Sequence, residues 1–198
     1  MKIAITGGIG SGKSYVCQRL QARNIEVYDC DAAAKRLMCT SVELQNKLQQ
    51  LVGEGLYIKG VLQKPLLAKF LLASEENAKA VNEIVHPAVA HDFEQSGKDW
   101  IESAIYFDSG FNKRISIDKV VCITAPIATR IARVMHRDGI SREKTLEWIA
   151  RQLPQEDVRR LSDFEIVNDG IRDIDSQIDA FLQCIDISSE GKNNEIQQ

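Results

Sequence analysis

The sequence predicts an α/β fold in which a parallel sheet carries helices on both faces. Short apolar runs recur along the chain, segments with helical spacing separate them, and polar residues or glycines end each run. Strands that alternate with helices in this way are typical of a parallel sheet. The predicted strands cover residues 2–6, 25–29, 101–107, 119–124 and 164–167.

Helical segments are expected between these strands, at residues 14–23, at 32–38 and from 127 onward. Residues 31–99 contain little strand signal and several leucine- and valine-rich runs, so they are expected to form a small helical lobe. Residues 188–198 are polar and are expected to form a frayed tail.

His86 and Pro87 are expected to end one helix and begin the next, because proline is tolerated at the first helical position. A lone histidine of this kind is more often structural than catalytic.

The composition is that of an ordinary globular domain. Of the 198 residues, 44% are hydrophobic and 27% are charged, and the net charge of −3 argues against a general nucleic-acid binder. The five cysteines are odd in number and show no C-x-x-C spacing, so neither a disulfide framework nor a zinc site is predicted. With no apolar run long enough to span a membrane, a cytoplasmic location without membrane contact is expected.

The strongest local signal is the segment Gly7 to Ser14, GGIGSGKS, which matches the phosphate-binding pattern G-x-x-x-x-G-K-[ST]. A predicted strand precedes it and a predicted helix follows it. In that context its backbone N–H groups and the helix N-terminus are expected to hold the phosphates of ATP, and the Ser14 hydroxyl to bind Mg²⁺. The expected nucleotide-binding residues are Ile9, Gly10, Ser11, Gly12, Lys13 and Ser14.

A guanine-specific switch protein would normally also carry N-K-x-D and D-x-x-G segments. The segment Asn112 to Ile115 lacks the required aspartate, and no D-x-x-G segment occurs. This favours a kinase over a GTPase.

Acidic residues follow two of the predicted strands. Asp29 and Asp31 follow the second strand, on the sheet edge where ligands bind in parallel α/β folds. Asp31 is expected either to act as a base for an attacking hydroxyl or to cap the next helix. Asp108 follows the third predicted strand, where it either helps to place Mg²⁺ through a water molecule or opens a turn.

Three arginines, Arg130, Arg133 and Arg137, have the i, i+3, i+7 spacing that places them on one helix face. Like charges so placed repel each other, and a bound polyphosphate would remove that penalty. The segment therefore predicts a lid that brings arginines to a transferring phosphoryl group. The alternative is a solvated helix with acidic partners such as Asp138 and Glu143.

Several blocks of the sequence together resemble the dephospho-CoA kinases. These blocks are GGIGSGKS, VYDCDA at 27–32, IVHPAV around His86, RVMHRDG at 133–139, Gln152, and SDFEIVNDG at 162–170. Their order and spacing agree with the family from about Lys2 to Leu182.

The resemblance implies a P-loop kinase that transfers the ATP γ-phosphate to the 3′-hydroxyl of dephospho-CoA, the last step of coenzyme A synthesis. It implies one kinase domain over 1–187, with its core at 1–31 and 100–187, a helical substrate lobe at about 32–99 and a lid at about 133–155. The oligomeric state stays open.

The resemblance also assigns residues. It implies Asp31, Lys13 and Arg137 as catalytic residues. Arg133 falls on a lid arginine, and Asn168 lies where the family approaches the adenine. The implied acceptor-binding residues are Asp29, Lys64, His86 and Asp108.

Three positions depart from the family pattern. Asp108 stands where a glutamate is usual, Lys64 stands where arginine is favoured, and Val167 stands where an acid is common. Lysine offers a phosphate only a point charge in place of a bidentate contact. A kinase for another small acceptor and a nucleotide-dependent switch are the competing hypotheses.

Overall fold

The computed structural model describes residues 1–195, which divide into two compact units. Unit 1 contains Met1–Val27, Asp99–Asp108 and the residues from Ser116 onward. Unit 2 contains Tyr28–Lys98 and Ser109–Ile115. The expected bounds of a core at 1–31 and 100–187 and a lobe at about 32–99 stay a prediction, and the units differ from them at 28–31, at Asp99 and at 109–115.

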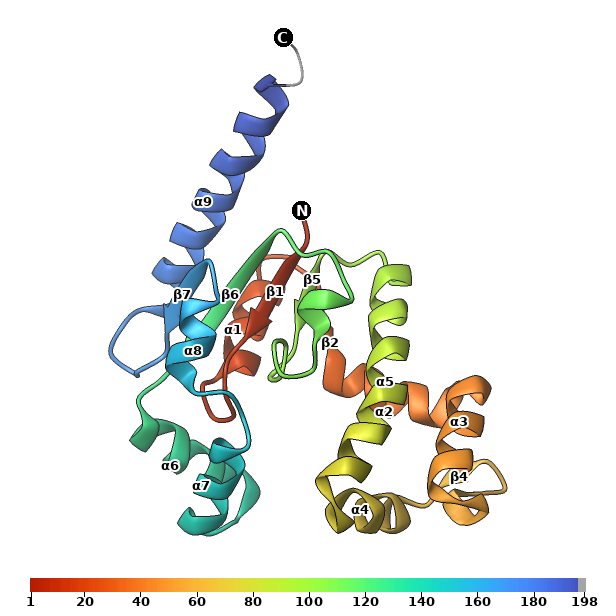
Figure 1. Cartoon of the computed structure of the whole chain (residues 1–198). Coiled ribbons are helices and arrows are strands. Elements are labelled where there is room, and N and C mark those ends of the chain that lie inside the picture. Colours follow the sequence, from red (N-terminus) through yellow and green to blue (C-terminus); the bar gives the residue numbers. More distant parts are fainter. Residues whose placement is uncertain (196–198) are drawn as a thin grey trace. The chain divides into compact units, whose positions relative to one another are not determined.

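Unit 1 contains the five-stranded sheet except for the last two residues of β2, and the strand order is β2-β5-β1-β6-β7 (Figure 1). The pairs β1–β5, β1–β6 and β6–β7 are parallel, which confirms the predicted fold class. The strands are β1 (Ile3–Thr6), β2 (Val27–Asp29), β5 (Trp100–Glu102), β6 (Lys119–Thr124) and β7 (Phe164–Val167). The helices of unit 1 are α1 (Lys13–Gln21), α6 (Ile127–Asp138), α7 (Arg142–Ala150), α8 (Gln155–Arg160) and α9 (Ile174–Glu195).

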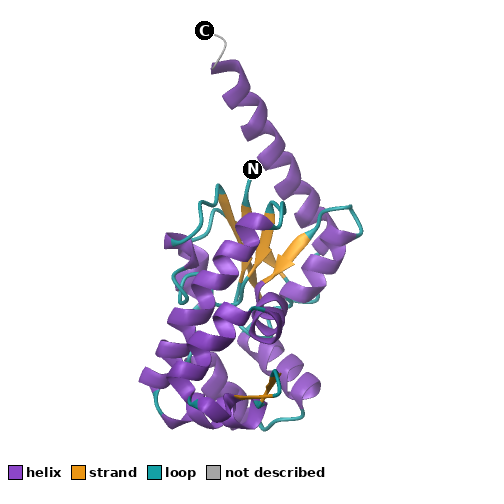
Figure 2. Ribbon diagram, turned by 90° about the vertical axis from the view of Figure 1, so that its right-hand side faces the viewer, coloured by secondary structure: helices purple, strands orange, loops and turns teal. Residues whose placement is uncertain are grey.

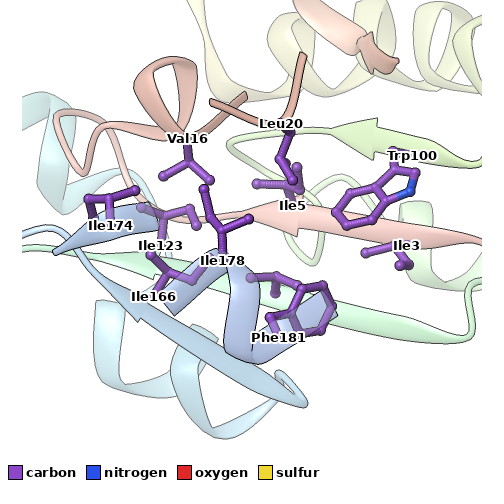
Figure 3. Close-up of a cluster of buried hydrophobic side chains, with 11 residues drawn as sticks. Ile3, Ile5, Val16, Leu20, Trp100, Ile123, Ile166, Ile174, Ile178 and Phe181 are labelled. Carbon is purple, nitrogen blue, oxygen red and sulfur yellow. The ribbon is translucent and has the colours of Figure 1, made fainter. Parts of the chain in front are cut away.

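The main core lies between one face of this sheet and helices α1 and α9 (Figure 3). Alternate residues of β1, Ile3 and Ile5, meet Leu20 of α1 and Phe181 of α9 there. Each large apolar side chain so buried contributes about 1.5–3 kcal/mol. Figure 2 shows helices flanking the strands. On the other face, Val158 of α8 lines a pocket together with Thr6.

The predicted strand over 101–107 is too long. Strand β5 ends at Glu102, and residues 104–110 form turns. The Ser103 N–H, which donates to Ile5 O at 3.0 Å, continues the pairing by one residue. The apolar run that indicated a strand is partly buried by loop packing, as the 2% exposure of Tyr106 shows.

Unit 2 is mainly helical, as predicted. Its elements are α2 (Cys30–Thr40), α3 (Val42–Val52), η1 (Glu54–Leu56), β3 (Tyr57–Ile58), β4 (Val61–Leu62), α4 (Lys64–Ala73), α5 (Glu75–Gln95) and η2 (Phe111–Lys113). The β3–β4 hairpin was not predicted, because two-residue strands leave almost no periodic signal. Its turn places Lys59 (φ 51°) and Gly60 (φ 78°) in the left-handed region.

The expected helix break at His86 and Pro87 is wrong. Helix α5 continues through Pro87. A proline inside a helix removes one hydrogen bond and costs about 3 kcal/mol. The continuous buried stripe of Val81, Val85 and Val89 offsets that cost, because it keeps both halves of the helix on one core.

Helix α9 runs past the sheet toward the C-terminus (Figure 1). It reaches Glu195, so the part of the expected frayed tail at 188–195 is helical instead, and 196–198 lie outside the described residues. Serine, glutamate and lysine are compatible with a continuing helix. None of the helices that the structure describes is long and apolar enough to cross a membrane.

Ion pairs connect α1 and the residues just after it with α9. Asp175 accepts hydrogen bonds from Arg19 and, at 2.8 Å, from Arg23, and these two arginines hold the pKa of Asp175 below its usual value. Since the folded-state pKa lies below the unfolded one, this contribution to stability exists above the unfolded pKa. It disappears as the pH falls through the folded value.

We therefore expect Asp175→Asn to lower the melting temperature at pH 7, and the difference from wild type to shrink below about pH 4. Thermal denaturation followed by circular dichroism at pH 7 and pH 3 measures both. Asp157→Asn removes an exposed carboxylate of α8 as the matched control. An equal loss in the control, or a loss from Asp175→Asn that persists at pH 3, contradicts the role of these ion pairs.

Candidate active site

The segment GGIGSGKS connects β1 to α1, as predicted. Gly12 caps α1 with φ 95° and provides no side-chain acceptor for the first-turn N–H groups. A Cβ at Gly12 would lie 2.0 Å from Asn168 Nδ2, so both the backbone conformation and the available space require glycine. A glycine loop therefore leads into the N-terminus of α1, where an anion can bind.

Side chains from distant segments hold the carbonyl groups of this loop. Asn168 Nδ2 donates to Ser11 O at 3.0 Å, and Arg133 Nη1 donates to the same oxygen at 3.2 Å. Arg133 Nη2 donates to Asn168 Oδ1 at 3.1 Å. Asn168 is 7% exposed and both ends of its amide are hydrogen-bonded, so its side chain supports the loop.

The loop N–H of Ile9 is also bound, since it donates to Gln152 Oε1 at 2.7 Å. Gln152 belongs to one of the blocks that carry the family resemblance, but no local pattern in the sequence places it on the loop. Its neighbour Leu153 donates its N–H to Asp108 Oδ2 at 3.2 Å. Asp108 and Gln152 line the pocket beside Gly8.

Lys13 faces an acid that the sequence analysis missed. Lys13 Nζ donates to Gly7 O at 2.8 Å and lies 3.7 Å from Glu102 Oε1. The Lys13 side chain is 10% exposed and that of Glu102 is 15% exposed, so the pair is largely removed from solvent. Glu102 is the last residue of β5. Because the predicted strand extended to residue 107, Asp108 was predicted as the acid at the strand end.

Ser14 is the second residue of α1 and is exposed to solvent. Of the described residues, no group of three or more histidines, cysteines or carboxylates could hold a metal ion by itself.

The three arginines of α6 lie in very different environments. Arg130 is 4% exposed, and burial lowers its pKa. Arg133 reaches the loop. Arg137 is exposed and forms two hydrogen bonds with Asp138, at 2.9 and 2.8 Å. The helical stripe thus runs from the buried loop to solvent, and the expected acidic partner Asp138 pairs with Arg137.

In unit 2, the cap of α2 is Asp29. Its Oδ1 accepts from Ala32 N at 2.9 Å. Asp31 is exposed in the first turn of the helix, and among the described residues no hydrogen bond or ion pair occupies its carboxylate. The alternative that Asp31 caps the helix is therefore wrong.

The start of α2 is anchored to α5. Asp92 Oδ2 accepts from Tyr28 Oη and from Arg36 Nη2, both at 2.5 Å. Burial, with a further effect from Asp92, raises the pKa of Tyr28. Tyr28 also packs edge-on against Phe93, with ring centroids 5.3 Å apart. These contacts fix the backbone from which Asp29 and Asp31 project.

The other two candidates in unit 2 have separate positions. Lys64 is exposed at the first residue of α4. His86 is half-buried in α5, and its ring centroid lies 5.7 Å from that of Phe111. Burial lowers the pKa of His86, which fits a histidine that packs η2 against α5.

Known proteins match nearly the whole chain. The family model for dephospho-CoA kinase matches residues 1–173. A dephospho-CoA kinase of Bacteroides fragilis is 39% identical over 205 residues, covering 98% of this chain and 99% of that protein.

Two solved structures share the fold. TT1252 from Thermus thermophilus has a TM-score of 0.78 and 29% identity, covering 92% of this chain and 96% of that one. A dephospho-CoA kinase from Campylobacter jejuni has a TM-score of 0.62 and 20% identity, covering 97% of this chain and 100% of that one. Because the family model and a relative of nearly equal length agree with the loop found here, the chain belongs to the dephospho-CoA kinase family of ATP-dependent phosphotransferases.

Proposed function

We propose that the loop of unit 1 binds ATP and that unit 2 supplies most of the residues that bind dephospho-CoA and the base that activates its 3′-hydroxyl. The observation that carries the proposal is the N-terminus of α1, which Gly12 caps without a side-chain acceptor while Lys13 lies beside it. Family membership supports the identity of both substrates. The cysteine pattern of the sequence supports a cytoplasmic location as part of the same proposal.

The nucleotide roles follow from the loop. The backbone N–H groups from Ile9 to Ser14 hold the phosphates in this proposal, and to take part the Ile9 N–H must leave Gln152 Oε1. Lys13 leaves Gly7 O to bind the outer phosphates. Arg133 and Asn168 act on the nucleotide through the loop, because both hold Ser11 O.

Mg²⁺ fits the residues present. With no cluster of three ligands in the described chain, the ion would depend on phosphate oxygens plus one or two protein oxygens, which is the usual arrangement for Mg²⁺. We assign these oxygens to Ser14 and Glu102, since Glu102 ends a strand beside Lys13 and Asp108 does not. Bound there, Mg²⁺ neutralises phosphate charge during the transfer.

Asp31 is the proposed base. Its exposed carboxylate can accept the proton of the acceptor hydroxyl, while Asp29 holds the helix turn that presents it. Arg137 neutralises phosphoryl charge in this proposal, and to do so it must leave Asp138. Lys64 binds an acceptor phosphate, His86 keeps η2 on α5, and Asp108 contributes to acceptor binding from its pocket.

An acceptor panel tests the reaction. With ATP and Mg²⁺, we expect dephospho-CoA to stimulate ADP release strongly and to be converted to CoA, as followed by chromatography. Stimulation by a different small alcohol would indicate another kinase. Slow ADP release that no acceptor accelerates would indicate a switch protein and contradict the proposal.

Replacing the proposed base separates chemistry from binding. We expect Asp31→Asn to reduce kcat by about 10²- to 10⁴-fold, because general base catalysis typically contributes that much. ATP binding, measured by calorimetry, should stay at the wild-type level. Asp29→Asn, which keeps an oxygen able to cap α2, is the neighbouring control. Near-wild-type turnover of Asp31→Asn would exclude Asp31 as the base.

The assignment of Glu102 to Mg²⁺ binding can be tested by substitution. We expect Glu102→Gln to raise the Mg²⁺ concentration needed for half-maximal ATP binding by about 10-fold or more, the usual effect of losing a residue that helps hold a metal. Titration of Mg²⁺ against a fluorescent ATP analogue measures this without turnover, and Asp108→Asn is the matched comparison. A larger increase in the required Mg²⁺ concentration for Asp108→Asn would assign Mg²⁺ binding to Asp108 instead of Glu102.

A further inference from the structure

Arg130 is a buried cation that the proposed mechanism does not use. It lies on α6 with 4% of its surface exposed. The one hydrogen bond of its side chain among the described residues runs from Nε to the loop oxygen Ile9 O, at 2.9 Å.

The charge of Arg130 has no anionic partner in the described part of the chain. Arg137 on the same helix pairs with Asp138, whereas no described carboxylate forms an ion pair with Arg130. Burial lowers the pKa of Arg130, and among the described residues the nearby Cys122 acts in the opposite direction. A buried charge without a counter-charge destabilises a folded protein.

The phosphate loop is shaped around this side chain. A Cβ at Gly8 would lie 2.2 Å from Arg130 Nη2, and a Cβ at Gly10 would lie 2.6 Å from Arg130 O. The guanidinium therefore lies directly against the loop backbone at Gly8, and the main chain of α6 lies against Gly10. Its positive charge is thus fixed next to the loop that we assign to the triphosphate.

We propose that Arg130 is a positioning residue whose charge is compensated only when a polyphosphate fills the loop, and which holds the Ile9 carbonyl in place for that ligand. The inference rests on the proposed nucleotide site. In the nucleotide-free protein the uncompensated charge of Arg130 lowers the folding stability, and a bound nucleotide removes this cost. Arg130 therefore raises nucleotide affinity while it lowers the stability of the nucleotide-free protein.

The test compares Arg130→Met with wild type in two measurements. The Kd for ATP with Mg²⁺, measured by calorimetry without acceptor, should rise by about 10- to 100-fold, the range for losing an interaction with a charged group. The loss should be larger for ATP than for AMP. The melting temperature of the nucleotide-free protein should stay the same or rise, because the uncompensated charge is gone.

Two further variants separate charge from packing. Arg130→Lys keeps the charge and should recover part of the affinity. Arg160→Met changes the net charge equally but removes an exposed arginine that pairs with Glu156, so its ATP affinity should match wild type.

The opposite pattern overturns the inference. A nucleotide-free protein that melts at lower temperature while ATP affinity is unchanged would make Arg130 a packing residue only. If the wild-type protein binds no ATP, the proposed nucleotide site itself is wrong, and this inference falls with it. Should Arg130→Met not fold, the NMR signal of Arg130 Nε–H in wild type decides, because it must shift when inorganic tripolyphosphate saturates the protein, and an unmoved signal contradicts the proposal.

Discussion

The loop between β1 and α1 can bind phosphates only if its N–H groups can turn to the ligand while its carbonyl groups are held elsewhere. In this structure, Arg130 binds Ile9 O, and Arg133 and Asn168 bind Ser11 O. A carbonyl that turned inward would repel a phosphate, so these donors fix the polarity of the site. The site therefore depends on α6 and on the segment after β7, which are distant from the loop in sequence.

This arrangement also explains the composition of α6. A helix that presents three arginines on one stripe is unfavourable in isolation, because the like charges repel. Here each arginine has a different environment: Arg130 is buried against Gly8, Arg133 is shared between Ser11 and Asn168, and Arg137 pairs with Asp138. The stripe is therefore a series of separate contacts, and only its exposed end can exchange partners without unpacking the helix.

The sequence predicted the sheet, the helical lobe and the phosphate loop because each has a local signal: an apolar run, helical spacing or a glycine pattern. It failed where tertiary packing overrides such signals. The apolar residues from Ala104 to Phe107 lie in turns, and Pro87 lies inside a helix that its buried face holds together. The ion-pair partner of Lys13 and the supporting role of Asn168 depend on distances between segments, which no local pattern contains.

The division into two units has a consequence for how the substrates are held. Every loop contact described here lies within unit 1, whereas Asp31 takes its position from a separate network of Tyr28, Arg36 and Asp92 in unit 2. Substitutions in the two networks should therefore affect the proposed nucleotide affinity and acceptor activation independently, because the two networks share no residue. The groups that fix the loop polarity take no part in fixing Asp31, so the acceptor side can change while the carbonyl groups of the proposed nucleotide site stay in place.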